Sequence, residues 1–413
     1  MHILLIHQAF AAINEPGGTR HHEIARYMVK QGHQVTIITS PISYLTGENA
    51  GGKTRWVTRD NREPGITILR AYTYPALHRS FVHRILSFFS FMFSSFFIGL
   101  GVKKVSAIWG TTPPIFQGWT AWLLSRLKGV PILFEVRDLW PAFAIAVGVL
   151  KNKTLIRLSE WLECFLYRHA DEMVVNSPGF IDHISLRGAK KITLVENGVD
   201  VSMFDMTETG TNFRKTHHLE NKFIALYAGA HGISNNLGVV LESAALTLDD
   251  PEIAYVFVGD GKEKANLIEE AKAKQLTNIL FLSSVPKMEM NAVLAAADAC
   301  IAILKPIDMY KTTYPNKVFD YMAAAKPVLL LIDGVIRKVV EDAHCGKFIE
   351  PDNPTALAEQ IKIMHNGGED AKRMGLNGRE YVQQHFNRST LAAKMEEVFL
   401  TLLRINEKSH PGR

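Results

Sequence analysis

Apolar and polar positions follow a repeating pattern along the chain, in which short β-branched runs alternate with longer stretches of helical spacing. This pattern predicts strands joined by helices, and therefore parallel sheets with helices on both faces. The predicted strands are HILLIH, HQVTIIT, ITILRA, VSAIWG, PILFEV, EMVVNS and ITLVEN, followed in the second half by FIALYAGA, IAYVFVG, ILFLSS, ACIAILK, PVLLLI and GKFIE. The predicted helices between them include residues 19–31, 115–127, 152–169, 235–248, 262–275, 287–297 and 315–325.

The polar segment 196–212 separates two such halves, so the predicted fold class is α/β, with two Rossmann-like doubly wound domains that face each other across a cleft. We expect an N-terminal domain over residues 1–200 and a C-terminal domain over 201–385. Residues 386–408 have one apolar face and predict a last helix that packs back on the first domain.

Composition and charge narrow the class of protein. With 413 residues, 47% hydrophobic and 21% charged, the chain is long enough for two domains with large cores. Its three cysteines fit neither a disulfide framework nor a zinc site, and no signal peptide is visible, so we expect a cytoplasmic protein. Residues 1–200 hold 22 Lys+Arg and 14 Asp+Glu, which suits an anionic surface or substrate; no nucleic-acid-binding signature is present.

Glycine pairs follow several predicted strands, where parallel sheets bind ligands. Gly17 and Gly18 precede the first helix and leave room for a phosphate at its N-terminus, although they could equally ease a tight turn. In the second half the glycines after strands are Gly229, Gly232, Gly259 and Gly261. We expect them to bring backbone amides close to a ligand. His231 could add a donor or a positive charge, or be a satisfied turn histidine, and Asp260 is interpreted as a helix cap.

The segment YKTTYPNKVFDYMAAAKPV, residues 310–328, carries the richest chemistry. Pro315 suits the first turn of a helix, so the amides at Asn316 and after it, next to Tyr314, would lie at a positive helix N-terminus. Lys317 adds a full charge where helices disfavour cations, which suits a diphosphate. Asp320, one turn later, suits ribose hydroxyls; the alternative is an exposed ion pair between Lys317 and Asp320.

Two further segments each allow a functional and a structural interpretation. Arg137 and Asp138 end a strand in RDLWP, where Asp138 could orient or deprotonate an acceptor hydroxyl, or pair structurally with Arg137. Gly47–Thr54 matches the phosphate-loop pattern, but no strand precedes it directly and no helix follows, so a glycine-rich surface loop is expected.

A Phe-rich helix is predicted near residues 80–104, with no charge between Arg84 and Lys103. Its eighteen uncharged residues reach the lower limit of a membrane span, and serines and glycines dilute it, so we expect a helix at the membrane interface. A buried core helix is the alternative. The residues expected to contact lipid are Arg84, Phe88, Phe91, Phe96, Lys103 and Lys104.

Several motifs occur together in this chain: GGTRHHEIARYM, WGTTPP, RDLWP, ENGVD, YAGAHG, VGDG and YPNKVFDYMAAAKPV. Together they resemble the GT-B glycosyltransferases of family 4, which retain anomeric configuration and use nucleotide sugars. The resemblance extends to bacterial O-antigen and capsule enzymes, including L-fucosamine transferases. Such enzymes carry two glutamates eight positions apart, where this chain has Thr312 and Asp320. They also carry an Arg and a Lys after the first strand of the second domain, where this chain has only His231; we expect Lys317 to supply that charge.

The resemblance implies transfer of a sugar from a UDP-sugar to a lipid-linked saccharide at the inner face of the cytoplasmic membrane. No cofactor and no metal are expected, because helix amides and Lys317 would stabilise the leaving diphosphate. Without a convincing protein nucleophile, front-face attack assisted by the leaving phosphate is the expected route. A non-hydrolysing UDP-sugar 2-epimerase and a non-catalytic nucleotide-sugar-binding protein are the alternatives; a Rossmann dehydrogenase would need a G-x-G-x-x-G fingerprint that EPGGTRH lacks.

Overall fold

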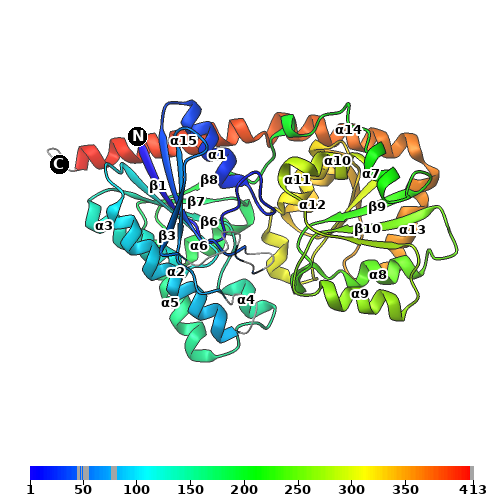
Figure 1. Ribbon diagram of the computed structural model, residues 1–413, viewed down its shortest axis with the longest axis horizontal. Helices are drawn as coiled ribbons and strands as arrows, with labels where there is room; N and C mark the ends of the chain where they lie inside the picture. Colours follow the sequence, from blue (N-terminus) through cyan, green and yellow to red (C-terminus); the bar gives the residue numbers. More distant parts are fainter. Residues whose placement is uncertain (44–46, 48, 50–54, 76–80, 410–413) are drawn as a thin grey trace. The chain divides into compact units, whose positions relative to one another are not determined.

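In the computed structural model the chain forms two compact units, which are labelled along the ribbon in Figure 1. The first unit comprises Met1–Ala12, Gly17–Glu196 and Ser389–Arg413, and the second comprises Ile13–Pro16 and Asn197–Arg388. The structure describes residues 1–43, 47, 49, 55–75 and 81–409. Most of the Gly47–Thr54 segment lies outside the described residues.

The first unit contains an eight-stranded sheet of order β3-β4-β2-β1-β5-β6-β7-β8. Its strands are β1 (His2–Ile6), β2 (Gln34–Thr39), β3 (Val57–Asp60), β4 (Ile66–Ala71), β5 (Ala107–Thr111), β6 (Ile132–Val136), β7 (Glu172–Val175) and β8 (Ile192–Leu194). All neighbours are parallel except β3, which pairs antiparallel with β4 at the edge. The seven predicted strands are confirmed, and β3 was missed because its sequence VTRD is short and polar.

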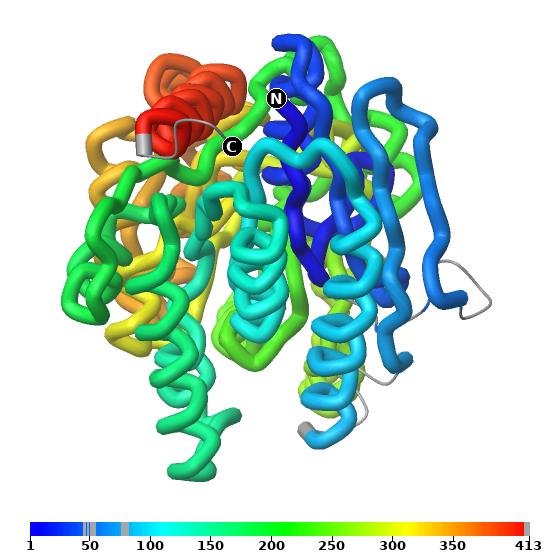
Figure 2. Tube along the Cα trace, turned by 90° about the vertical axis from the view of Figure 1, so that its left-hand side faces the viewer, coloured from blue at the N-terminus to red at the C-terminus, as the bar shows by residue number. Residues whose placement is uncertain are grey.

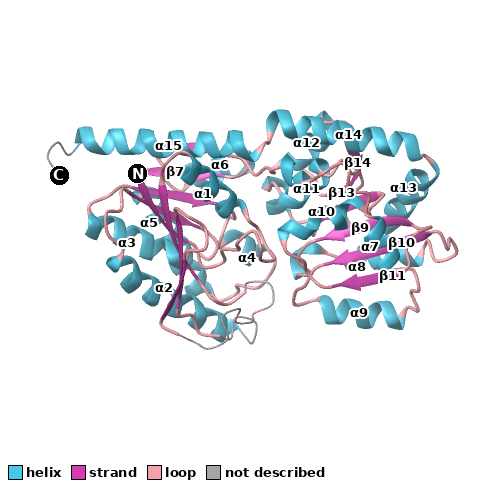
Figure 3. Ribbon diagram, turned by 45° about the horizontal axis from the view of Figure 1, so that its top comes forward, coloured by secondary structure: helices cyan, strands magenta, loops and turns pink. Residues whose placement is uncertain are grey.

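Helices cover both faces of this sheet, as Figure 3 shows. They are α1 (Arg20–Lys30), α2 (Phe81–Gly101), α3 (Phe116–Lys128), α4 (Ala142–Ala146), α5 (Lys153–His169), α6 (Ile181–Leu186) and α15 (Arg388–Ser409). Alternate residues of β1 face opposite ways: Leu5 packs with α1 and α15, whereas Leu4 packs with α2 and α3. On α15, Met395 and Phe399 are fully buried in the core that contains Leu5, so this helix completes the first unit.

The second unit contains a six-stranded, fully parallel sheet of order β11-β10-β9-β12-β13-β14. Its strands are β9 (Phe223–Ala228), β10 (Ile253–Val258), β11 (Ile279–Leu282), β12 (Ala299–Ile303), β13 (Val328–Leu331) and β14 (Gly346–Phe348). Its helices are α7 (Thr211–Thr216), α8 (Gly238–Ala245), α9 (Lys264–Ala273), α10 (Met290–Ala295), α11 (Asn316–Ala323), α12 (Val335–Asp342), α13 (Pro354–Asn366) and α14 (Gly368–His385). All six predicted strands are confirmed, and the mixed α/β fold with two parallel-sheet units matches the predicted class.

Candidate functional site

Two loops at the carboxyl ends of β9 and β10 pack against each other in the second unit. A Cβ atom on Gly259 would lie 1.9 Å from the Gly229 carbonyl oxygen, and one on Gly261 would lie 2.5 Å from the His231 carbonyl oxygen. Both Gly259 and Gly261 have positive φ angles, 154° and 156°. These glycines are therefore required because the two backbones touch, and no side chain fits at either position.

Backbone hydrogen bonds fix the loops that carry Gly229 and Gly259. The Gly229 amide donates to the Val258 carbonyl at 2.9 Å, and the Gly259 amide donates to the Leu282 carbonyl at 3.1 Å. These two amides therefore hold the loops together, and the expectation that the glycines bring other backbone amides close to a ligand stays a prediction. The Gly232 amide, by contrast, donates to no other residue in the part of the chain that the structure describes.

His231 lies fully buried between the two loops. Neither ring nitrogen has a hydrogen-bond partner among the described residues. Burial, reinforced by the charge of Lys264, lowers the pKa of His231 from 6.5 to about 4, so the imidazole is neutral at physiological pH. Of the two roles predicted for His231, a neutral ring can fill that of a hydrogen-bond donor, whereas burial disfavours a positive charge. The alternative of a satisfied turn histidine does not fit the two unbonded ring nitrogens.

Asp260 joins the loop after β10 to the segment after β11. Its carboxylate accepts hydrogen bonds from the amide and the hydroxyl of Ser284, both at 2.7 Å, and forms an ion pair with Lys264 at 2.8 Å. Helix α9 begins at Lys264, with Glu263 at the N-cap position. The interpretation of Asp260 as the helix cap is therefore wrong, because its oxygens bond Ser284 instead.

Lys317, in the first turn of α11, points its ammonium group at the loop after β9. The Nζ atom lies 2.7 Å from the Tyr227 hydroxyl oxygen, 3.3 Å from Asn235 Oδ1 and 4.1 Å from the centre of the Tyr227 ring. A Cβ atom on Gly229 would lie 3.0 Å from Nζ, so the glycine makes room for this side chain. No carboxylate among the described residues forms an ion pair with Lys317.

Burial lowers the pKa of Lys317 from 10.5 to about 7. Its neighbours Tyr227 and Asn235 are neutral, so nothing nearby compensates the charge that burial disfavours. An incoming anion would supply that compensation and raise the pKa again.

The first turn of α11 offers backbone donors beside this lysine. Pro315 is the N-cap residue and makes no side-chain cap. Within the described residues, the amides of Asn316 and Lys317 have no acceptor, and Asn316 Oδ1 is buried without a partner. Free amides at a helix N-terminus with an adjacent cation form an anion-binding arrangement.

The remaining residues of this segment are placed differently from the prediction. Asp320 forms an ion pair with Lys287 at 2.5 Å rather than with Lys317. Its expected ribose contact would therefore compete with Lys287. The Tyr314 ring packs against Phe319 and Phe386 at centroid distances of 5.7 and 5.9 Å, which makes the ring part of the core.

In the first unit, Arg137 and Asp138 follow β6, as expected, but they do not pair with each other. The Arg137 guanidinium donates to Thr111 Oγ1 at 3.1 Å, to the Thr112 carbonyl at 3.0 Å and to His7 Nε2 at 2.7 Å. Burial raises the pKa of Asp138 from 3.8 to about 7, and the charge of Arg137 offsets only part of this shift. A carboxyl group with a pKa near 7 can exchange a proton with a substrate hydroxyl near neutral pH.

A buried polar network next to this loop was not predicted from the sequence. Glu135, in the middle of the sheet, accepts from Arg20 at 2.8 Å, from His21 at 2.8 Å and from Trp109 at 3.1 Å. Burial would raise the pKa of Glu135, but the charges of Arg20 and His21 outweigh it and hold the pKa well below its usual range. The signal was a single charged residue inside the apolar strand ILFEV.

This network begins directly after Gly17 and Gly18. Both glycines are exposed, and Gly17 has a φ angle of 140°, while Arg20 and His21 in the first turn of α1 are buried. The prediction of a phosphate at this turn stays a prediction. The buried Arg20 charge is committed to Glu135 and to the carbonyls of Val195 and Glu196.

Helix α2 has the expected length, but its inward and outward faces differ from the prediction. Phe88 and Phe91 are 7% and 0% exposed, and Phe96 is half-buried against the core, so these three are the wrong residues for a lipid contact. The outward face instead exposes a stripe of apolar side chains: Val82, Leu86, Phe89, Phe93, Phe97 and Leu100. The segment Val82–Gly101 is long and apolar enough to span a membrane, although buried core helices also meet that criterion; it is the only such segment found in the described ranges.

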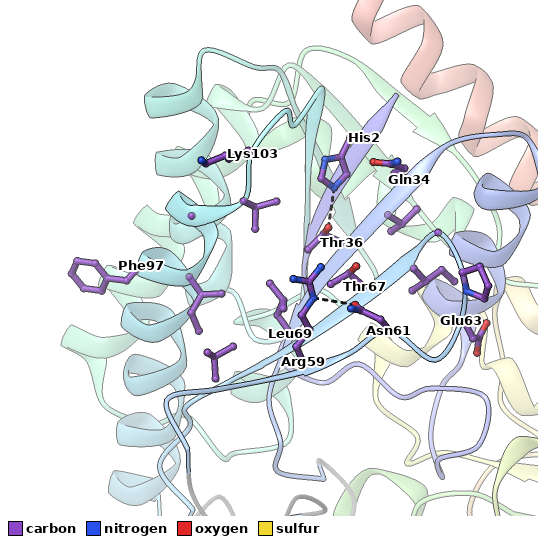
Figure 4. A pocket seen from close by; sticks show the side chains of 18 of the residues that line it. His2, Gln34, Thr36, Arg59, Asn61, Glu63, Thr67, Leu69, Phe97 and Lys103 are labelled. Carbon is purple, nitrogen blue, oxygen red and sulfur yellow. Dashed lines mark hydrogen bonds between the residues drawn. The ribbon is translucent and has the colours of Figure 1, made fainter.

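Two other features lie at the amino ends of the strands, away from the loops described above. A cavity of about 930 Å³ is lined by β1, β2, β3, β4 and the end of α2; in it His2 bonds Thr36 at 2.8 Å and Arg59 bonds Asn61 at 3.1 Å (Figure 4). In the second unit, Asp250, Glu252 and His365 form the one metal-compatible cluster among the described residues. Ligands of parallel sheets bind at the opposite, carboxyl ends.

The two doubly wound units with parallel sheets, the second of which carries Lys317 beside a helix N-terminus, are the type of domains expected of a GT-B glycosyltransferase. Residues 208–381 match the family model for glycosyl transferases group 1, and residues 17–198 match the glycosyl transferase 4-like domain. The chain belongs to family 4 of the GT-B glycosyltransferases, so it is a glycosyltransferase, as the resemblance predicted.

Individual relatives agree with this assignment. WcaI of Escherichia coli, assigned by name to colanic acid biosynthesis, is 25% identical over 82% of this chain and 86% of its own. The O-antigen chain mannosyltransferase C of Escherichia coli is 19% identical over 62% of this chain and 67% of its own. The sucrose-phosphate synthase structure from Thermosynechococcus elongatus has a TM-score of 0.78 and 17% identity, over 98% and 99% of the two chains, and shares the fold.

A structure of Anabaena Alr3699/HepE in complex with UDP and glucose is also similar, with a TM-score of 0.72 and 14% identity. It covers 97% of this chain and 100% of its own. At this identity the similarity establishes the fold alone.

Proposed function

We propose that this enzyme transfers a sugar from a UDP-sugar to a lipid-linked saccharide during the synthesis of a bacterial surface polysaccharide, with retention of configuration. Two relatives are named for colanic acid and O-antigen synthesis, and a structural neighbour binds UDP and glucose. These names support the substrate classes. The transfer is proposed to need no metal, because the chain itself supplies the positive charge.

The observation that carries the proposal is the environment of Lys317. A half-buried lysine whose ammonium group contacts only neutral partners, beside the unbonded amides of Asn316 and Lys317, is suited to a diphosphate. As the bond between the anomeric carbon and the diphosphate oxygen breaks, negative charge grows on that oxygen. A cation and helix dipole placed there stabilise the transition state more than the ground state.

Asp138 is proposed to act on the acceptor. Its carboxylate would accept or share the proton of the acceptor hydroxyl as the new glycosidic bond forms on the face that the leaving diphosphate occupied. The leaving phosphate oxygen can take that proton in turn, so no covalent glycosyl-enzyme intermediate is needed. Arg137 holds the loop through Thr111, Thr112 and His7, and neutral His231 is left to bond the donor.

The outward stripe of α2 supports attachment to the cytoplasmic face of the membrane. Phe93 and Phe97 are 59% and 56% exposed, and Lys103 and Lys104 follow at the exposed end of the helix. Large exposed aromatics next to cations are typical of a helix that lies in the interface of an anionic bilayer. This would bring the enzyme to a membrane-bound acceptor.

The test is a thermal-shift screen against nucleotide sugars, followed by mass spectrometry of products formed with a bacterial lipid extract. We expect a UDP-sugar to raise the melting temperature, and the extract to yield a glycosylated lipid together with UDP. Conversion of the UDP-sugar without any acceptor would identify an epimerase instead. Binding without conversion under either condition would identify a non-catalytic binding protein.

A further inference from the structure

A concave apolar groove opens on the first unit between α2 and α5. Its volume is about 450 Å³, within the range of small-molecule sites. Figure 2 shows α3 between these two helices, and Trp119 of α3 lines the groove together with Phe89 and Met92 of α2 and Leu158 and Trp161 of α5. We call this site the α2–α5 groove.

Several large apolar side chains that line the α2–α5 groove are exposed to solvent. Leu158 and Trp161 are each 57% exposed, and Phe89 is 40% exposed. The Trp119 and Trp161 rings lie 6.4 Å apart, so the aromatic groups form one continuous lining. A contiguous exposed apolar surface of this kind marks an interaction site rather than scattered surface residues.

One end of the groove adjoins the loop that carries Asp138. Trp140 lines the groove, its ring lies 5.5 Å from that of Phe116, and its amide donates to the Asp138 carbonyl at 2.9 Å. A ligand that fills the groove would therefore reach within two residues of the proposed proton acceptor. A groove that only contacts the bulk bilayer need not end next to the Asp138 loop, whereas a groove that binds the tail of a substrate should.

Positive charge lies around the amino-terminal end of α5, close in sequence to the lining residues Leu150, Leu155 and Leu158. Lys151, Lys153 and Arg157 are exposed, and none of the three forms an ion pair with another described residue. The acidic residues of α5 differ: Glu160 is half-buried, and Glu163 is buried and paired with Arg187 at 2.7 Å. The rim is thus suited to anionic groups beside an apolar chain.

We propose that the α2–α5 groove binds the single hydrocarbon chain of a phosphate-linked acceptor lipid, with Lys151, Lys153 and Arg157 near its phosphates. This inference rests on the proposed function and adds where the acceptor's lipid part binds. The groove is concave and bounded by three helices, so it suits one chain. The convex stripe of Phe93 and Phe97 on α2 suits the bilayer instead.

The test measures binding of geranylgeranyl diphosphate, a single-chain diphosphate, by calorimetry below its micellar concentration. We expect the double variant Leu158→Ser/Trp161→Ser to weaken binding at least tenfold. Leu186→Ser is the matched control, because Leu186 on α6 is 86% exposed and outside the groove, and it should leave binding unchanged. Arg157→Gln should weaken binding of the diphosphate but not of geranylgeraniol.

Several outcomes would overturn the inference. The first is no binding of geranylgeranyl diphosphate, and the second is equal binding of it by the double variant and the wild type. The third is a loss of binding to phosphatidylglycerol vesicles in the double variant that equals its loss of binding to the probe, which would make the groove a bilayer contact. A dimer that the double variant abolishes in sedimentation velocity would assign the groove to a second copy of the chain. The UDP-induced thermal shift, measured on the same preparations, reports the proposed function separately and also shows that each variant is folded.

Discussion

Replacement of Lys317 by methionine tests the proposed diphosphate site, because it should affect the stability of the free enzyme and the affinity for UDP differently. Methionine keeps the length of the apolar stem and removes only the ammonium group, which contacts Tyr227 and Asn235. The free enzyme loses a charge that burial disfavours, whereas the complex with UDP loses the charge that would bind it. The free enzyme should therefore not be destabilised, and UDP affinity should fall.

The magnitudes follow from the pKa of Lys317. A shift from 10.5 to about 7, at roughly 1.36 kcal/mol per pKa unit, limits the cost of this lysine in the free enzyme to about 4 kcal/mol at pH 7. The pKa is lowered on folding, so this cost is full below pH 7 and disappears as the pH rises from about 7 to 10.5. A charge-assisted hydrogen bond contributes about 1.5–3 kcal/mol, so UDP binding should weaken about 10- to 150-fold.

The assays are urea unfolding without ligand and calorimetry with UDP at pH 8 in two buffers of different ionisation enthalpy. Wild-type Lys317 is mostly neutral at pH 8, so binding should take up close to one proton, and Lys317→Met should take up none. Lys326→Met is the control, since Lys326 is also half-buried and burial lowers its pKa, but its ammonium group bonds the Ala295 carbonyl. Unchanged UDP affinity and proton uptake in Lys317→Met would refute the assignment.

Three further predictions concern other parts of the chain. Asp138→Asn should lower transfer at least tenfold with donor binding intact and remove the rise in rate through pH 7, measured as a pH–rate profile; equal loss of both would indicate a structural role. Gly259→Ala should lower the free energy of unfolding by at least about 2 kcal/mol in urea, whereas Gly238→Ala, which has open space for Cβ, should change it little; equal effects would contradict the loop contact. Phe93→Ser/Phe97→Ser should release the protein from sedimented anionic vesicles without loss of stability, and unchanged sedimentation would refute the membrane contact.

The sequence was sufficient to predict the parallel strands of both sheets, because buried parallel strands are short, apolar and regularly spaced, but not the polar, antiparallel edge strand β3. It located Lys317 at a helix start, but its partner Tyr227 lies 90 residues away, and local spacing carries no information about that contact. For the same reason the Lys287 partner of Asp320 was missed.

Helix α2 shows a second limit of sequence reading. It is apolar on nearly all sides, so its hydrophobic pattern does not reveal which phenylalanines face the core. The serines were the better guide, since Ser87 and Ser94 are buried and Ser94 bonds the Tyr72 carbonyl. A small polar residue that can bond a neighbouring backbone marked the inward face.

The contribution of α15 to the first unit has a consequence for biosynthesis. Met395 and Phe399 fill the core that contains Leu5 and Trp109, so this core cannot close while a ribosome is still translating residues 389–402. The second unit, almost entirely contiguous in sequence, can fold first. A released chain that ends at Arg388 should therefore present a protease-resistant carboxyl-terminal portion and an amino-terminal portion that still binds chaperones.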